Sequence, residues 1–151
     1  MDESVDLTIN KMLLKKQACF TPLREDEIEK LAALLKEKHF LAGDTIVTEG
    51  DPVDSVYLIA KGKADVRTVS VKDNALHYTS VATLGPGEAI GLNETGFYSL
   101  SGRRTATVVA LENMDLLYLN IAEFHGFALA YSHVNEVMRK NAEKIVGEQP
   151  E

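Results

Sequence analysis

The 151-residue chain has a single cysteine, few basic residues and no long hydrophobic run. Cys19 alone can form neither an internal disulfide nor a thiolate zinc cluster, and low cysteine content fits a reducing compartment. With 16 Lys and Arg against 23 Asp and Glu, the net charge is −7, which argues against non-specific nucleic-acid binding and a polybasic membrane surface. Apolar runs such as 116–119 are too short to span a bilayer, and residues 1–10 lack the pattern of a signal peptide. We therefore expect a cytoplasmic protein that contacts neither nucleic acid nor membrane.

Glycine is scarce at both ends of the chain and frequent in the middle. Eight of the ten glycines lie within 43–102, where short alternating segments are separated by turn signals, as in a β-sandwich or barrel. Apolar residues at helical spacing predict helices over 7–18, from Ile28 to Leu35 and after Asn120, which can cap the last helical region. The polar stretch 71–78 predicts a hairpin with an exposed tip. We expect one domain, helical over 1–38, β over 39–120 and helical again over 121–147.

Three glycine- and arginine-containing segments carry the chemistry. They are residues 43–59 followed by Gly62, the segment Leu84-Gly85-Pro86-Gly87-Glu88-Ala89-Ile90-Gly91, and the segment Arg103-Arg104-Thr105-Ala106-Thr107-Val108. Their order and spacing resemble the cyclic nucleotide-binding domain family of catabolite-activator-type regulators, cyclic-nucleotide-dependent kinases and gated channels, over roughly 15–145. The resemblance implies a mainly β fold, a double-stranded β-helix jelly roll with N-terminal and C-terminal helices. It also implies a short helix whose first N–H groups bind the cyclic phosphate, as helix N-termini do in general.

The resemblance assigns a phosphate site around Arg104. Arg104 matches the family's phosphate-binding arginine, Ala106 would offer its backbone N–H to the phosphate, and the Thr105 hydroxyl could bond a guanine edge. The ligand implied is therefore cAMP or cGMP, with a slight preference for cAMP.

The family also has a glutamate that accepts a hydrogen bond from the ribose hydroxyl, and this sequence can be aligned with that part of the motif in two ways. In one, Gly91 is followed by Leu92 and the acceptor is lost. In the other, which we prefer, Asn93, Glu94 and Thr95 match the family's glycine, glutamate and following small residue, with Asn93 at a positive φ. Gly91, Asn93, Glu94 and Thr95 thus join Arg104, Thr105 and Ala106 as the predicted cyclic nucleotide-binding residues.

Other interpretations stay open for the same residues. Arg104 can be an ordinary rim arginine paired with Glu88 or Glu94, in which case the chain is a degenerate member that serves as a protein-interaction module without nucleotide. A cupin-like metalloenzyme would need at least two converging histidines, and the four histidines lack the clustered cupin pattern. We expect no catalysis, no metal and no cofactor.

The expected function is a non-catalytic regulatory module. Nucleotide occupancy would shift the population of the C-terminal helices, which requires a ligand that binds one helix arrangement better than the other. With no output domain in these 151 residues, the signal would pass to a second copy or a separate effector protein through the terminal helices, or the chain is a fragment of a longer protein.

Overall fold

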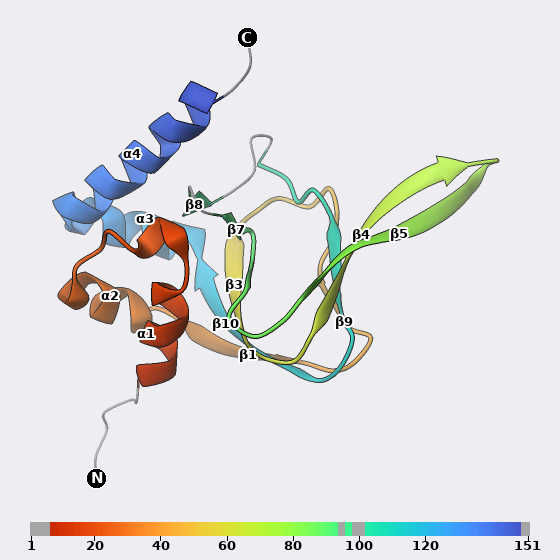
Figure 1. Ribbon diagram of the computed structural model, residues 1–151, viewed down its shortest axis with the longest axis horizontal. Helices are drawn as coiled ribbons and strands as arrows, with labels where there is room; N and C mark the ends of the chain where they lie inside the picture. Colours follow the sequence, from red (N-terminus) through yellow and green to blue (C-terminus); the bar gives the residue numbers. More distant parts are fainter. Residues whose placement is uncertain (1–6, 94–95, 98–101, 149–151) are drawn as a thin grey trace.

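The computed structural model describes residues 7–93, 96–97 and 102–148, with helices at one end and two four-stranded antiparallel sheets at the other (Figure 1). The N-terminal helical element consists of α1 (Thr8–Lys15), the 3₁₀ turn η1 (Ala18–Phe20) and α2 (Glu25–Ala32). Three acidic residues in its first turn complement the α2 dipole, and the Glu27 carboxylate accepts the Arg24 N–H at 2.7 Å. The expected helix over 7–18 is therefore shorter than predicted and ends before η1.

The strands form two sheets and one small hairpin. The first sheet has the order β1-β10-β3-β6 and the second has the order β2-β9-β4-β5. Their bounds are β1 Lys36–Phe40, β2 Thr45–Val47, β3 Ser55–Lys61, β4 Ala64–Lys72, β5 Ala75–Leu84, β6 Ala89–Ile90, β9 Thr107–Ala110 and β10 Met114–Asn120. The strands β7 (Leu92–Asn93) and β8 (Gly96–Phe97) pair with each other. The predicted mainly β jelly roll with helices at both ends is confirmed.

The boundary between the first helical region and the β region differs from the prediction. Strand β1 begins at Lys36, inside the range expected to be helical. Its sequence is polar and largely exposed, so it carries no alternating pattern. Pairing with β10, not local propensity, makes it a strand.

Strand β3 separates two hydrophobic clusters because its successive side chains point to opposite faces. Val56 and Leu58 pack with the helices, whereas Tyr57 and Ile59 pack between the two sheets. Strand β10 divides its side chains in the same way. Strands β3 and β10 are therefore buried on both faces and form the centre of the molecule.

The C-terminal helices begin where β10 ends. The Asn120 side chain accepts the Glu123 N–H at 3.1 Å, so the predicted cap on α3 (Ile121–Ala130) is confirmed. Tyr131 has an extended backbone, with φ of −122°, and separates α3 from α4 (Ser132–Glu148). His133 on α4 contacts the buried Glu27 carboxylate on α2 at 2.8 Å. No helix in the described ranges is long and apolar enough to cross a membrane.

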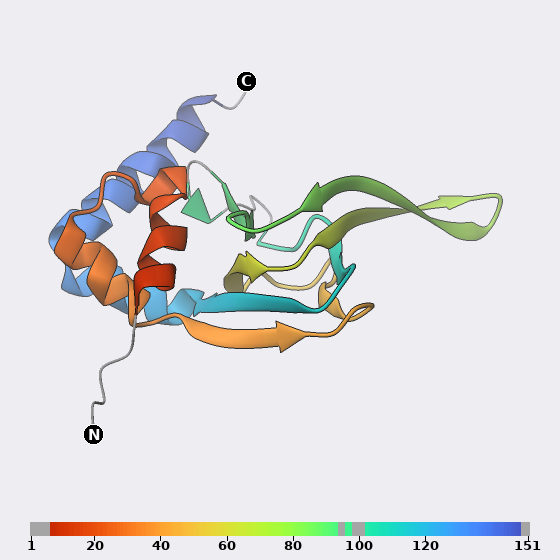
Figure 2. The same ribbon diagram turned by 60° about the horizontal axis from the view of Figure 1, so that its bottom comes forward.

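The predicted hairpin is much longer than its exposed tip. Strands β4 and β5 pair over nine register positions, from Ala64 opposite Leu84 to Lys72 opposite Ala75. Asp73 and Asn74 form the turn, with φ of 52° and 63°. Figure 2 shows the hairpin extending away from the barrel, on the side opposite the helices.

Candidate functional site

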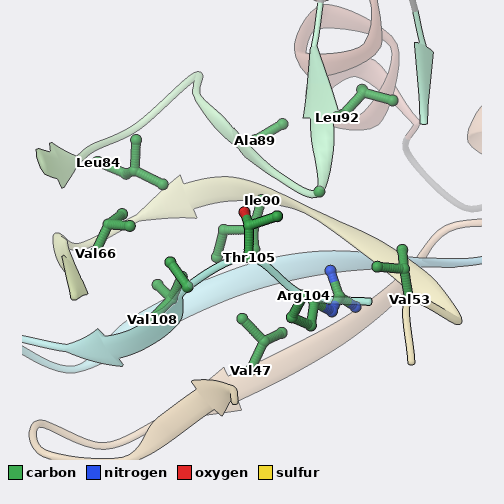
Figure 3. A pocket seen from close by; sticks show the side chains of 12 residues that line it. Val47, Val53, Val66, Leu84, Ala89, Ile90, Leu92, Arg104, Thr105 and Val108 are labelled. Atoms are coloured by element: carbon green, nitrogen blue, oxygen red, sulfur yellow. The ribbon is translucent and has the colours of Figure 1, made fainter. Parts of the chain in front are cut away.

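A cavity of about 160 Å³ is lined by residues from both sheets and from the loops between their strands. Among the described residues that line it, most are aliphatic and Arg104 is the one with a charged side chain (Figure 3). The residues that line it are Val47, Val53, Val66, Leu84, Ala89, Ile90, Gly91, Leu92, Arg104, Thr105, Ala106 and Val108. An apolar pocket with a few polar groups is the usual form of a small-molecule site.

Arg104 is held by one half of its guanidinium group. Nη2 donates to the Ser55 carbonyl at 2.8 Å and to the Ser55 Oγ at 3.3 Å. Two backbone bonds anchor the residue itself: its N–H donates to the Asp51 carbonyl at 2.7 Å, and its carbonyl accepts the Gly50 N–H at 2.9 Å. The guanidinium is therefore fixed in direction before any ligand arrives.

The other half of the guanidinium is buried without a partner. Arg104 is 8% exposed, and within the described ranges its Nη1 is the buried side-chain nitrogen that makes no hydrogen bond. Burial lowers the pKa of Arg104 below its ordinary value, although Tyr57, Asp54 and Asp51 partly offset this effect. The nearest of these acids in charge contact is Asp54, 3.9 Å from Nη2 and largely exposed. A desolvated cationic donor with no acceptor is costly, so the site favours an anion at Nη1.

Gly91 permits this arrangement of Arg104. Its φ is +86°, and a Cβ on it would stand 2.7 Å from Nη1. The sequence alignment placed a positive φ at Asn93, but Asn93 lies in β7, and the described non-glycine residues with positive φ are Asp73 and Asn74. The glycine beside the arginine is thus Gly91, and the predicted positive φ at Asn93 is wrong.

The backbone after Arg104 also faces the cavity. Thr105 and Ala106 both line the cavity; Thr105 is exposed and Ala106 is half-buried. In Figure 3 the Thr105 side chain points toward the segment that carries Ile90. Among the described residues, neither Thr105 nor Ala106 uses its N–H group in a hydrogen bond. Three residues in a row at the lining, Arg104 to Ala106, thus each carry a hydrogen-bond donor without a partner among the described residues.

The structure brings together four of the predicted site residues, namely Gly91, Arg104, Thr105 and Ala106. Glu94 and Thr95 lie outside the described residues, and only the backbone of Asn93 is described. Leu92 lines the cavity and is half-buried.

Several features near the site differ from the expectations or were missed. Residues 92–93 and 96–97 form β7 and β8, and residues 94–95 and 98–101 lie outside the described residues, so the short helix that the resemblance implied stays a prediction. Glu88 is not the partner of Arg104, because its Oε1 accepts the Gly85 N–H at 2.7 Å. The role of Ser55 was missed, since it lies 49 residues from Arg104 and no local pattern marks it.

Neither a metal site nor converging histidines are found in the part of the chain that the structure describes. It contains no group of three or more His, Cys, Asp or Glu side chains that could hold a metal ion. His39 contacts Asp115 and His133 contacts Glu27, far from each other in the fold. Burial raises the pKa of Cys19 to about 12, so this residue is an inert thiol of the helical core.

Comparison with known proteins identifies relatives of this fold and site. The family model described as cyclic nucleotide-binding domain matches residues 37–131. A cGMP-dependent protein kinase of Drosophila melanogaster, isozyme 2 forms cD5/T2, is 28% identical over 84% of the chain, which covers 13% of that kinase. A cAMP-dependent protein kinase regulatory subunit of Colletotrichum orbiculare is 31% identical over 65% of the chain, which covers 23% of that subunit. The chain thus spans less than a quarter of the length of these relatives.

Solved structures show the same architecture. The N-terminal domain of a transcriptional regulator from Streptomyces coelicolor A3(2) matches with a TM-score of 0.75 and 27% identity, covering 90% of each chain.

Proposed function

The chain belongs to the cyclic nucleotide-binding domain family, and we propose that it is a non-catalytic regulatory module that binds cAMP or cGMP in the cavity at Arg104. The observation that carries the proposal is the Nη1 of Arg104, which is buried and has no acceptor among the described residues. A cyclic phosphodiester carries one negative charge spread over two oxygens. Such a group satisfies a guanidinium that is already oriented by its other nitrogen.

The apolar part of the cavity suits the rest of such a ligand. Aliphatic side chains from both sheets form its wall, including Val47 and Val108 from the second sheet and Ile90 from the first. A purine ring is flat and largely apolar on its faces, so these walls provide contact while the donors at Arg104, Thr105 and Ala106 fix the phosphate. Relatives named for cAMP and relatives named for cGMP both match the chain, which leaves the base open.

Occupancy of the site can reach the C-terminal helices through a short path. Ser55, which holds Arg104, is opposite Asn120 in the ladder of β3 and β10. Asn120 caps α3, and the Ile121 N–H donates to the Asp54 carbonyl at 3.0 Å. A ligand that draws the guanidinium toward the cavity therefore acts on the segment that fixes the start of α3. For relay, it must bind one arrangement of α3 and α4 more tightly than another. A second copy or a separate effector protein would receive the signal through these helices.

Calorimetric titration of cAMP and cGMP tests the site. We expect binding to the unmodified chain and a loss of about tenfold to a hundredfold in Arg104→Ala, since charge-assisted hydrogen bonds contribute about 1.5–3 kcal/mol each. Arg103→Ala is the matched control, because Arg103 is exposed and donates to the Gly50 carbonyl, away from the cavity lining. Absence of heat with either nucleotide at millimolar concentration would overturn the proposal, and binding that survives Arg104→Ala would overturn the site. Circular dichroism verifies that the variants are folded.

Leu92 supports a second candidate function. It lines the cavity directly after Gly91, where one alignment of the family motif places the ribose-binding acid. A leucine there leaves the ribose hydroxyls without an acceptor, which favours a degenerate domain that serves as a protein-interaction module. The two candidates differ in the titration. A Leu92→Glu variant that gains nucleotide affinity, where the unmodified chain shows none, would establish the degenerate form.

A further inference from the structure

Strand β5 is a long, exposed edge without charge or proline, and its register with β4 shifts once, opposite Val66 and Arg67, on the barrel side of Tyr78. It lies at the end of its sheet, and no described strand pairs with its outer side. Nine of its ten residues are exposed, and the strand contains no Lys, Arg, Asp, Glu or Pro. Natural proteins commonly block an edge with charge, proline or a very short strand, because an open edge pairs readily with another chain.

From Leu76 to Ser80, every second residue of β5 turns its backbone N–H and C=O groups toward the free edge. The Val69 N–H on β4 donates to the Glu49 carboxylate at 3.2 Å, so it points away from β5. Val69 is opposite Tyr78, which makes this a non-hydrogen-bonded pair, and Tyr78 therefore turns its own N–H and C=O toward the free edge. By the alternation of an antiparallel ladder, Leu76 and Ser80 do the same.

One face of the hairpin beyond the barrel is apolar. Val69 is opposite Tyr78, and Val71 is opposite Leu76, so these four side chains share a face. Val71, Leu76 and Tyr78 are 69%, 63% and 65% exposed, so this face is largely open to solvent. The opposite face carries polar residues, namely Thr68, Ser70, Lys72, His77 and Thr79. A two-stranded ribbon is marginal alone in water, so an apolar face of this kind favours a partner.

We propose that this edge binds a second copy of the chain, with the two β5 strands antiparallel about a two-fold axis at Tyr78. Tyr78 is the middle one of the three outward-facing residues, so this axis places each N–H of one strand opposite a C=O of the other. An isologous contact requires such a self-complementary patch.

The charge of the chain suits a second copy at this edge, and the small contact makes the complex weak. The chain carries a net charge of −7, so most of its surfaces repel another copy, whereas β5 brings no charged side chain to the contact. Edge-to-edge pairing covers the outer backbone groups of β5 and brings the Leu76 and Tyr78 side chains of the two copies side by side, while Val69 and Val71 stay one strand away on β4. A contact confined to one strand edge falls below the roughly 1,000 Å² of a stable complex, so the dimer is weak and reversible.

Sedimentation velocity from ~10 μM to ~1 mM chain, without nucleotide, tests the proposal at the concentrations where a weak complex forms. We expect a rise from monomer to dimer mass, and monomer throughout this range for Tyr78→Lys and for Leu76→Lys. Both positions are exposed, so the substituted chains remain folded, and each places two like charges close to the axis. Ser70→Lys is the matched control, since it adds the same charge to the same hairpin on β4 and on the polar face. We expect it to dimerise within about twofold of the unmodified chain, a shift typical of a screened distant charge.

Amide hydrogen exchange provides an independent readout of the pairing. Tyr78 should become protected as the concentration rises, while exchange in α3 is unchanged. Three results would overturn the proposal. The first is a monomer at every concentration, and the second is a dimer that persists in both lysine variants. The third is a dimer abolished by Leu129→Lys on α3, which would assign the contact to the terminal helices. Leu129 is 71% exposed and serves as the probe of that alternative.

Discussion

Gly91→Ala is the substitution that most directly tests the geometry at Arg104. A residue other than glycine at a φ of +86° costs about 1–2 kcal/mol. The new Cβ would also stand 2.7 Å from Nη1 of Arg104 and 3.3 Å from Val56 Cγ1, an overpacking of the kind that costs about 1–3 kcal/mol. We expect the free energy of unfolding to fall by about 2–5 kcal/mol in total. The same displacement of the guanidinium should weaken nucleotide binding.

Gly43→Ala provides the matched control for this substitution. Gly43 has a φ of +92°, but nothing lies within 4 Å of a Cβ built on it. The control therefore carries only the conformational cost of about 1–2 kcal/mol. Urea denaturation followed by circular dichroism measures both variants, with the m-value as the check on two-state behaviour. Equal losses in Gly91→Ala and Gly43→Ala would refute the close contact with Arg104. Adding Arg104→Ala to Gly91→Ala should remove most of the excess, because Nη1 is then absent and only the longer contact with Val56 Cγ1 is left.

Three further substitutions or reactions test other parts of the structure. The pKa of Glu27 is lowered overall: burial, the largest effect, opposes this, but the Arg24 N–H and His133 outweigh it. A lowered pKa stabilises the fold above the ordinary carboxyl pKa of about 4.3, and this stability is lost as the pH falls toward the lower value in the folded state. Glu27→Gln should therefore flatten the acid limb of a plot of unfolding free energy against pH, and an unchanged limb would contradict the assignment. Cys19, with its pKa raised to about 12 by burial, should react with a thiol reagent such as DTNB only at the rate of unfolding, and fast labelling of the native chain would show that the helical core is open. Asn74→Val places a β-branched residue at a φ of 63° and should destabilise the hairpin by about 1–2 kcal/mol, seen as faster amide exchange in β4 and β5 and not in β3.

The parts of the fold that could be predicted are those in which local pattern and tertiary packing agree. Apolar spacing found the helices, and the alternation from Val56 to Ile59 found a strand, because β3 is buried on both faces and every one of those side chains packs. Strand β1 could not be found in this way. Its polar residues adopt an extended form because β10 supplies the hydrogen bonds, and β10 lies more than 70 residues further along the chain.

In the candidate site, too, the sequence could predict what depends on neighbouring residues and not what depends on distant ones. Arg104, Thr105 and Ala106 form one contiguous segment, so the motif alone located them at the cavity. The motif could not indicate which half of the guanidinium is free, since that depends on Ser55 in another strand. The wrong positive φ at Asn93 has a related cause. Gly91 and Asn93 are two residues apart, and either could match the glycine of the family motif. Only the contact between Gly91 and Arg104 shows which of them has the positive φ.

Two of the chain's acidic residues act on its one buried arginine, Arg104. Asp54 and Asp51 counter the effect of burial on the pKa of Arg104, so they help to keep the guanidinium charged. Asp54 is too exposed and, at 3.9 Å, too distant to act as a tight ion-pair partner. If either carboxylate formed a close bidentate pair with Arg104, the cation would be neutralised and no anion would gain by entering the cavity. A buried charge that is balanced by solvated acids on one side and unpaired on the other adds little to stability, but it gives a site in which binding energy comes from the ligand.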